Sequence, residues 1–262
     1  MSESGYSSDE SFSERDFYLA ELNQFRKKYE IKYKLMTSAN GDIFTGCSIQ
    51  DQRTVIVKKI AKKCGINRQS GIPPEIYFHQ EASKLSDQVV ELIEYFELKK
   101  SFVIILEKPE NSIDLFEFVT RYGPMNELMA VTVIKKIAHV CVQLFNGGIC
   151  HRDVKTENIL FNPLTFDIKL IDFGSATRIE PFYSKSAGTQ DYLPPEVMPT
   201  PDKLTSWSLG CVLYILLTAK SPFGNGDFIF NFCKINCSFK TKLLISNLLN
   251  TDSNQRMSIF QF

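Results

Sequence analysis

Short apolar runs separated by turns fill the chain from residue 29 to residue 106, a pattern typical of β-strands. One helical stretch interrupts them at residues 73–83. It opens on Pro73-Pro74, and proline suits the first turn of a helix. The pattern therefore predicts an antiparallel sheet and one helix, with strands at residues 29–36, 43–50, 53–60, 90–97 and 102–106.

Longer runs with helical spacing follow residue 110. Residues 126–146 carry an apolar stripe that ends at Gly147-Gly148, residues 204–218 are apolar nearly all round, and residues 239–249 look amphipathic. Two short apolar runs lie between the first two helices, at residues 159–161 and 168–171, and Asn162-Pro163 marks a turn between them. We expect an α+β fold whose strand-rich first part and mainly helical second part meet at residues 107–110.

Composition narrows the class of protein. The chain has 262 residues, is 44% hydrophobic and 23% charged, and balances thirty acids with thirty bases. These values fit a globular protein and argue against nucleic-acid or membrane binding. Seven cysteines without a CxxC pair fit a reducing compartment, so we expect a cytoplasmic, or also nuclear, protein. We also expect a monomer. The serine-rich, acidic residues 1–16 predict a disordered tail.

Two polar motifs flank the short strands of the second part. The first is His151-Arg-Asp-Val-Lys-Thr-Glu-Asn158, and the second is Ile171-Asp-Phe-Gly174. The strand pair brings four of their side chains to one edge of a small sheet: Asp153, Lys155, Asn158 and Asp172. Two carboxylates, an ammonium and an amide at one place suit phosphoryl transfer, which depends on positioning and charge neutralisation.

These motifs resemble the catalytic and metal loops of protein kinases. The break at Glu107-Lys-Pro-Glu110, followed by Asp114-Leu-Phe-Glu-Phe118, resembles the Pim serine/threonine kinases. The likeness extends from about residue 17 to residue 262. It implies the two-lobed kinase fold, with a small antiparallel-sheet N-lobe and helix αC at 17–107, a hinge at 107–110 and a larger helical C-lobe at 111–262. It also implies a reaction with ATP and Mg²⁺, with Mn²⁺ as an alternative.

The resemblance assigns roles to individual residues. Asp153 would accept the proton of the substrate hydroxyl, Lys155 would stabilise the transferring phosphoryl group, and Asn158 and Asp172 would hold the metal ions. Val55-Ile-Val-Lys58 resembles the kinase strand whose lysine contacts phosphates, and Glu75 would pair with this lysine, with Glu81 as the alternative. The expected nucleotide contacts are Leu35, Gly41, Ile43, Lys58, Glu107 and Asp172.

The resemblance also implies a substrate platform. Asp114, Glu117 and Glu157 fall where Pim-like kinases bind basic residues that precede the phosphorylated Ser or Thr; the alternative is ordinary surface acids. Lys220 stands where the Pim pattern has an acid, which argues against a preference for more distant basic residues. Thr189 is a further expected substrate contact. Two structural residues complete the set, Glu196 of the PPE segment and its expected partner Arg256.

Three departures from the kinase pattern bear on activity. In the glycine-rich loop only Gly41 remains, with Met36 and Ser38 at the other two glycine positions, so we expect weaker ATP binding. Thr205 replaces the aspartate that braces the catalytic loop in most kinases; Pim-like sequences depart from the aspartate there too, so this difference carries little weight. The sequence also stops six residues after Arg256, so we expect its last helix to fray.

Regulation and function each leave alternatives. In many kinases the arginine at the position of Arg152 binds a phosphate on the activation segment, and Tyr183, Ser184 and Ser186 are candidate acceptors. Pim-like kinases are active without phosphorylation of this segment, so the resemblance favours constitutive activity. An active serine/threonine kinase is the main hypothesis. The alternatives are a pseudokinase scaffold with an eroded glycine loop and, third, a small-molecule kinase.

Overall fold

The computed structural model describes residues 14–38, 41–62, 71–183, 188–224, 227–228 and 235–262. The chain forms two compact units. Unit 1 joins Met1–Cys64 to Leu92–Lys108, and unit 2 joins Gly65–Glu91 to Pro109–Phe262. The boundary at Lys108 falls within the predicted hinge at 107–110. The helix expected in the first lobe, however, belongs to unit 2.

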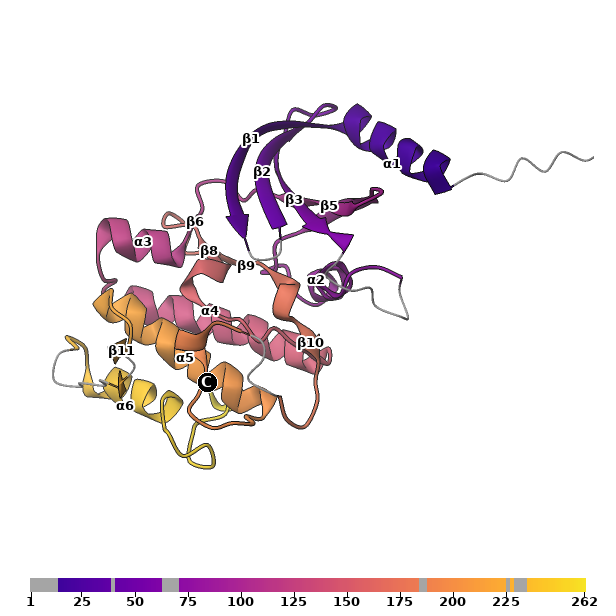
Figure 1. Cartoon of the computed structure of the whole chain (residues 1–262). Coiled ribbons are helices and arrows are strands. Elements are labelled where there is room, and N and C mark those ends of the chain that lie inside the picture. Colours follow the sequence, from indigo (N-terminus) through magenta and orange to yellow (C-terminus); the bar gives the residue numbers. More distant parts are fainter. Residues whose placement is uncertain (1–13, 39–40, 63–70, 184–187, 225–226, 229–234) are drawn as a thin grey trace, which may run out of the picture. The chain divides into compact units, whose positions relative to one another are not determined.

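Unit 1 is built on a five-stranded antiparallel sheet with the order β1-β2-β3-β5-β4 (Figure 1). The five strands predicted from the alternating pattern are confirmed, with ends that differ by two residues at most. Their bounds are β1 Tyr29–Ser38, β2 Gly41–Ser48, β3 Thr54–Ala61, β4 Leu92–Glu97 and β5 Ser101–Glu107.

A helix that the sequence pattern did not predict, α1 (Glu14–Lys28), leads into β1. It takes residues 14–16 out of the expected disordered tail, whose residues 1–13 lie outside the described part of the chain. Phe25 is buried against Phe96, with ring centroids 5.5 Å apart. At the other end Lys62 donates hydrogen bonds to Tyr18 (2.9 Å) and Glu97 (2.6 Å). These are tertiary contacts, so α1 depends on the sheet more than on its own weak amphipathicity.

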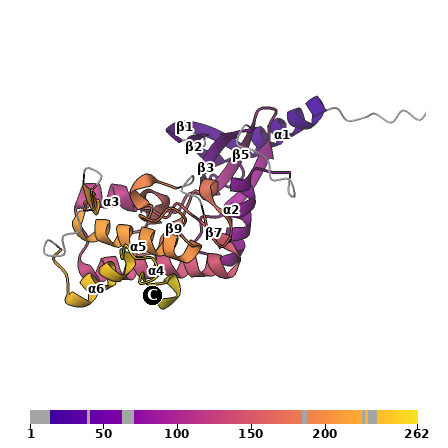
Figure 2. The ribbon, with the colours of Figure 1, turned by 60° about the horizontal axis from the view of Figure 1, so that its bottom comes forward.

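Unit 2 contains five α-helices within the described residues. Figures 1 and 2 both show α4 and α5 side by side, and α6 packs against α5. Asn126 caps α4 by accepting a hydrogen bond from the Met129 amide, and proline opens both α2 and α5. The four predicted helices are confirmed as α2 Pro74–Leu85, α4 Glu127–Asn146, α5 Pro201–Thr218 and α6 Phe239–Leu248. The fifth, α3 Leu115–Tyr122, was not predicted from the sequence.

One apolar core holds unit 2 together. Phe78 and Ala82 of α2 are buried in the same cluster as the inward face of α4, which explains why α2 belongs to this unit. α4 is, among the described residues, the one helix long and apolar enough to cross a bilayer by length and composition. Its residues Val133, Ile134 and Ile137 are buried in that cluster, as in a core helix.

Short strands and 3₁₀ turns complete unit 2. The predicted pair of small strands is confirmed as β8 and β9. The backbone N–H of Asn162 closes the turn between them by donating to the Asp167 carbonyl (2.9 Å). The described chain ends in a 3₁₀ turn, η6, where the sequence predicted a fraying helix. The bounds are β6 Ile113–Asp114, β7 Ile149–Cys150, β8 Ile159–Phe161, β9 Ile168–Leu170, β10 Thr177–Arg178, β11 Phe223–Gly224, β12 Asp227–Phe228, η2 Thr156–Asn158, η3 Phe173–Ser175, η4 Gln190–Tyr192 and η6 Ile259–Gln261.

Candidate active site

The β8–β9 ladder joins the two polar loops of unit 2. Ile159 pairs with Leu170, and one step further along the ladder the Ile171 amide donates to the Asn158 carbonyl (3.0 Å). Asn158 therefore ends the first loop beside the start of the second, where Asp172 lies. The local sequence explains this geometry, since each polar loop borders an apolar strand that has its partner in the same three-stranded sheet.

Asp153 is the centre of the hydrogen-bond network. Its Oδ1 accepts from the amide (2.9 Å) and the hydroxyl (2.8 Å) of Thr189. Its Oδ2 accepts from Asn158 Nδ2 (2.9 Å) and lies 3.0 Å from Lys155 Nζ. Lys155 also donates to the Thr189 hydroxyl (2.7 Å). Both carboxylate oxygens are thus fixed, which is the pre-organisation that a proton acceptor in catalysis needs.

His151 supports this loop from below. The ring is buried, with Nε2 3.0 Å from the Ile171 carbonyl and Nδ1 3.3 Å from the Asp153 amide. These partners require a neutral ring that carries its proton on Nε2. Burial lowers the pKa of His151 below its ordinary value of 6.5, although the carboxylates of Asp153 and Asp172 favour the charged ring. A second proton, on Nδ1, would face the Asp153 N–H and break that hydrogen bond.

We expect the free energy of unfolding to decrease as the pH falls below 6.5, because the unfolded chain then binds a proton that buried His151 resists. The contribution of His151 to the free energy of unfolding is complete above that pH. Below it, the free energy of unfolding decreases by at most about 1.4 kcal/mol per pH unit for one proton. Urea unfolding from pH 7.5 to 5.5 measures it. His151→Gln should flatten the curve, whereas His139→Gln, at an exposed histidine of α4, should not. Equal slopes for wild type and His151→Gln would contradict this assignment.

Asn158 and Asp172 have the chemistry of a magnesium site. Asn158 uses Nδ2 for both of its hydrogen bonds to Asp153, at 2.8 Å and 2.9 Å, so its Oδ1 is directed away from Asp153. Asp172 adopts φ +64° and accepts from the Gly174 amide (3.2 Å). Amide and carboxylate oxygens are hard donors that fit Mg²⁺. No group of three or more His, Cys, Asp or Glu with metal-binding geometry occurs among the described residues. The set therefore fits an ion that completes its shell with water and phosphate oxygens.

The three acids predicted to bind basic substrate residues gather beside the catalytic loop. The pKa of Asp114 is raised above its ordinary value, and burial is the largest cause. The hydrogen bond from the Glu117 backbone amide lowers this pKa, whereas the negative charges of Glu117 and Glu157 raise it further. Asp114 caps α3 by accepting from the Glu117 amide (2.7 Å), and Glu117 forms an ion pair with Arg121. Glu157 is the exposed acid of the three, and it accepts from the Thr156 hydroxyl (2.9 Å).

The structure joins Glu196 to Arg256 as the sequence predicted. Two guanidinium nitrogens of Arg256 meet the two carboxylate oxygens of Glu196 at 2.5 Å and 2.8 Å. Arg256 is fully buried, donates to the carbonyls of Asn250 (2.9 Å) and Lys203 (3.1 Å), and lies over the Trp207 ring at 4.8 Å. All three guanidinium nitrogens thus donate hydrogen bonds, and such partners offset the cost of burying the cation.

Comparison with known proteins identifies this arrangement. The model of the protein kinase domain family matches residues 29–262. The chain belongs to the protein kinase family. Among curated kinases, it is 33% identical to serine/threonine-protein kinase pim-2 of Danio rerio over 222 residues, 76% of this chain and 70% of that protein. It is 32% identical to serine/threonine-protein kinase prk-2 of Caenorhabditis elegans over 261 residues, 91% of this chain and 57% of that protein.

A third curated relative has a different kinase name. The kinase is 31% identical to the PAS domain-containing serine/threonine-protein kinase of Mus musculus over 214 residues, 75% of this chain and 15% of that protein. The predictions of a protein kinase fold and of a Pim-like serine/threonine kinase are confirmed by these relatives. α1 lies before the first residue that the family model matches.

The other predicted nucleotide residues of this kinase lie in unit 1. Met36, Ile43, Lys58 and Ile104 form one row across β1, β2, β3 and β5. Lys58 is buried, whereas Leu35 is exposed, and Glu107 ends β5. Glu75 is buried in unit 2, so the pairing of Lys58 with Glu75 stays a prediction.

Gly41 has a structural reason to remain glycine. Its φ is +148°, and a Cβ at this position would lie 2.0 Å from the Lys59 carbonyl oxygen of the neighbouring strand. Any side chain would therefore separate β2 from β3. The remaining glycine of the loop is explained by strand packing, independently of any phosphate contact.

Sequence reasoning missed three contacts of the site. The Thr189 side chain bridges Asp153 and Lys155, and its predicted contact with the substrate stays a prediction. The Tyr192 hydroxyl lies 2.9 Å from the Thr156 hydroxyl and donates to Glu157 (3.3 Å), for which the sequence has no local signal. Thr205, at the aspartate position, donates to the Pro201 carbonyl of its own helix (2.9 Å).

Proposed function

We propose that this kinase transfers the γ-phosphoryl group of ATP to Ser or Thr hydroxyls of protein substrates that carry basic residues before the acceptor. The observation that carries the proposal is the Asp153 carboxylate, which four donors hold in one orientation beside Lys155, Asn158 and Asp172. The serine/threonine kinases among its relatives support the same reaction class.

Each side chain has a part in the transfer. Asp153 orients the acceptor hydroxyl and takes its proton as the new P–O bond forms and the bond from the γ-phosphorus to the β–γ bridging oxygen breaks, which releases ADP. Lys155 balances negative charge on the moving phosphoryl group. Asn158 and Asp172 would hold Mg²⁺, which supplies positive charge to the phosphate oxygens. Lys58, paired with Glu75, would position the nucleotide, and Leu35, Gly41, Ile43 and Glu107 would surround it.

The proposed preference for basic substrates rests on the acidic cluster. Asp114, Glu117 and Glu157 lie close enough to raise the pKa of Asp114. Glu117 already has Arg121 as a partner, and the Asp114 carboxylate caps α3. Glu157 is exposed and accepts from the neutral hydroxyls of Thr156 and Tyr192, which leave its negative charge in place. It is therefore the member best placed to bind an incoming arginine, and a charge-assisted hydrogen bond to it would select such peptides.

The test compares two serine peptides that differ only in their arginines, three before the acceptor in one and alanines in the other. Wild type should favour the arginine peptide in kcat/KM. Glu157→Gln should reduce that ratio about tenfold, the effect of a lost charged hydrogen bond of roughly 1.5 kcal/mol. Asp87→Asn, at an exposed acid outside the cluster, is the matched control. Equal ratios for wild type and Glu157→Gln would refute the assignment of Glu157.

A pseudokinase scaffold is the second candidate, favoured by Met36 and Ser38 at two glycine positions of the nucleotide loop. Assays at millimolar ATP and Mg²⁺ distinguish the kinase from the pseudokinase scaffold. Folded protein that transfers no phosphate to either peptide and shows no thermal shift with the nucleotide would establish the scaffold. Transfer with a high KM for ATP would establish the enzyme and assign the weak affinity to this loop.

A further inference from the structure

We propose that Tyr183 is a positioning residue, which holds Arg152 and the adjoining Asp153 in place without a phosphate on the activation segment, residues 172–196. The inference rests on the kinase activity proposed above. It gives Tyr183 a role different from the phosphate acceptor considered in the sequence analysis. Ser184 and Ser186, the other two candidates, lie outside the described residues.

Tyr183 is fixed at its ring, its hydroxyl and its backbone. Tyr183 is only 4% exposed, and it packs in a cluster with Cys150 and Leu204. Its hydroxyl donates to the Arg178 carbonyl (2.9 Å) and accepts from the Glu180 amide (3.2 Å). Its backbone N–H donates to the Pro199 carbonyl (3.1 Å). A hydroxyl enclosed in this way is not presented to a phosphoryl donor.

The side chain of Arg152 is held by two contacts. Its guanidinium carbon lies 5.3 Å from the centroid of the Tyr183 ring, within the range of a cation–π interaction. Its Nε donates to the Ser175 carbonyl (2.7 Å), three residues beyond Asp172. The backbone of Arg152 has φ +62°, a region that residues other than glycine seldom adopt. The surrounding contacts must therefore maintain this conformation.

The activation segment reaches the catalytic loop again at Gly188. A Cβ on this glycine would lie 2.7 Å from the Arg152 carbonyl oxygen, and its φ of +97° also favours glycine. The next amide, that of Thr189, donates to Asp153 Oδ1 (2.9 Å). The segment thus contacts Arg152 through its side chain at Tyr183 and through its backbone at Gly188, and both contacts lie beside Asp153.

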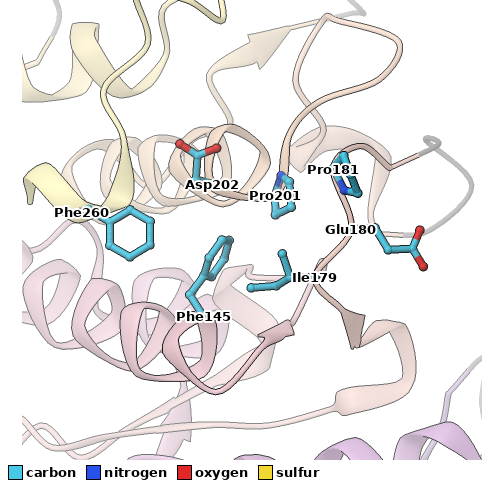
Figure 3. Close-up of a pocket in the computed structure, with 7 residues that line it drawn as sticks. All are labelled: Phe145, Ile179, Glu180, Pro181, Pro201, Asp202 and Phe260. Carbon is cyan, nitrogen blue, oxygen red and sulfur yellow. The ribbon is translucent and has the colours of Figure 1, made fainter.

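The stretch that leads to Tyr183 is itself anchored. The Ile179 amide donates to the Gly148 carbonyl (3.0 Å), just after β10 pairs with β7. Ile179, Pro181 and Pro201 line a pocket of about 490 Å³ together with Phe145 and Phe260. Figure 3 shows the Phe145 side chain beside Ile179. These contacts place Tyr183 on a built support, so its ring can hold Arg152 in the unphosphorylated protein.

The first test is kinetic and uses phosphatase-treated protein whose mass confirms the absence of phosphate. Tyr183→Leu keeps apolar bulk but removes the aromatic face, and kcat should fall about tenfold while KM for ATP and peptide change less than twofold. Tyr183→Phe restores the ring without the hydroxyl and should keep at least half of kcat. Wild type that loses its activity on dephosphorylation, or Tyr183→Leu as active as wild type, would overturn the proposal.

A double-variant cycle separates positioning from general stability. Once Arg152→Gln has removed the cation, Tyr183→Leu should reduce kcat no further, because the two residues act as one unit. Independent, multiplicative losses would overturn the proposal. If Tyr183→Leu does not fold, Arg152→Gln alone tests the same contact, since Tyr183 stays in place; unchanged kcat in that variant also overturns it.

Hydrogen exchange makes the test independent of catalysis. The Thr189 amide, bound to Asp153, should exchange faster in Tyr183→Leu than in wild type and Tyr183→Phe, and this holds even if no peptide is phosphorylated. Absence of transfer with the expected exchange pattern would reject the proposed function and keep the role of Tyr183. Phosphate transfer by wild type, with equal exchange of the Thr189 amide in all three proteins, would keep the proposed function and reject the role of Tyr183.

Discussion

Replacing Asp153 by asparagine is expected to reduce kcat by about 10²–10⁴-fold, the contribution typical of a positioned general base. The carboxylate accepts hydrogen bonds from Thr189 on one oxygen and from Asn158 on the other. An amide supplies only one acceptor oxygen, so one of these donors would face an NH₂ group, and the amide cannot take the proton of the substrate hydroxyl. Steady-state phosphorylation of the arginine peptide measures the loss.

The matched control is Asp167→Asn. Asp167 is an exposed carboxylate beside the β8–β9 turn, paired at the surface with Lys136 (3.0 Å), and its replacement should change kcat by less than about twofold. Thermal shift with ATP and Mg²⁺ should still report nucleotide binding by Asp153→Asn. If this folded variant keeps more than about a tenth of the wild-type kcat, the role given to Asp153 in transfer is wrong.

Arg256→Ala should decrease the free energy of unfolding by about 3–5 kcal/mol, because it leaves the Glu196 carboxylate without its bidentate partner. Such a loss is a large fraction of the roughly 5–15 kcal/mol that stabilises a typical protein. The carbonyls of Asn250 and Lys203 lose their donor as well. Trp207, the chain's one tryptophan, lies under the guanidinium, so its fluorescence in urea reports on this part of unit 2.

Arg53→Ala is the control for this prediction. Arg53 faces Asp51 at 3.9 Å, and both side chains are more than half exposed, so the expected loss is about 1 kcal/mol or less. Replacing both members of the buried pair, Arg256→Met with Glu196→Leu, should cost less than Arg256→Ala alone. A double variant less stable than Arg256→Ala would show that the contacts of Arg256 to the carbonyls, and not the ion pair, account for the stability.

The sequence predicted the strands and the long helices because their signals are local. The alternation of β2 and β3, the capped stripe of α4 and the turn at Asn162 each act within a few residues. The polar loops could be placed together because each borders one strand of the β8–β9 pair. Positions next to regular elements were therefore predictable from spacing alone.

Tertiary contacts decided what the sequence could not. α1 has little apolar periodicity and is held by Phe96 of β4 and by Lys62, which directly follows β3. Thr189 looks like any surface threonine until the chain returns to Asp153. Tyr183 has a serine-rich, loop-like neighbourhood in sequence, and only the fold shows that its ring is buried beneath Arg152. In each case the partner lies far away along the chain.

The position of α1 matters for anyone who prepares a shortened version of this kinase. A fragment begun at residue 29, the first residue that the family model matches, would lack Leu22 and Phe25. The apolar side chains that pack with them in unit 1, among them Phe96 and Val103, would then face water. Exposed apolar patches of this kind promote aggregation. A fragment for biochemical work should therefore begin at or before Glu14, upstream of the boundary that family comparison alone would suggest.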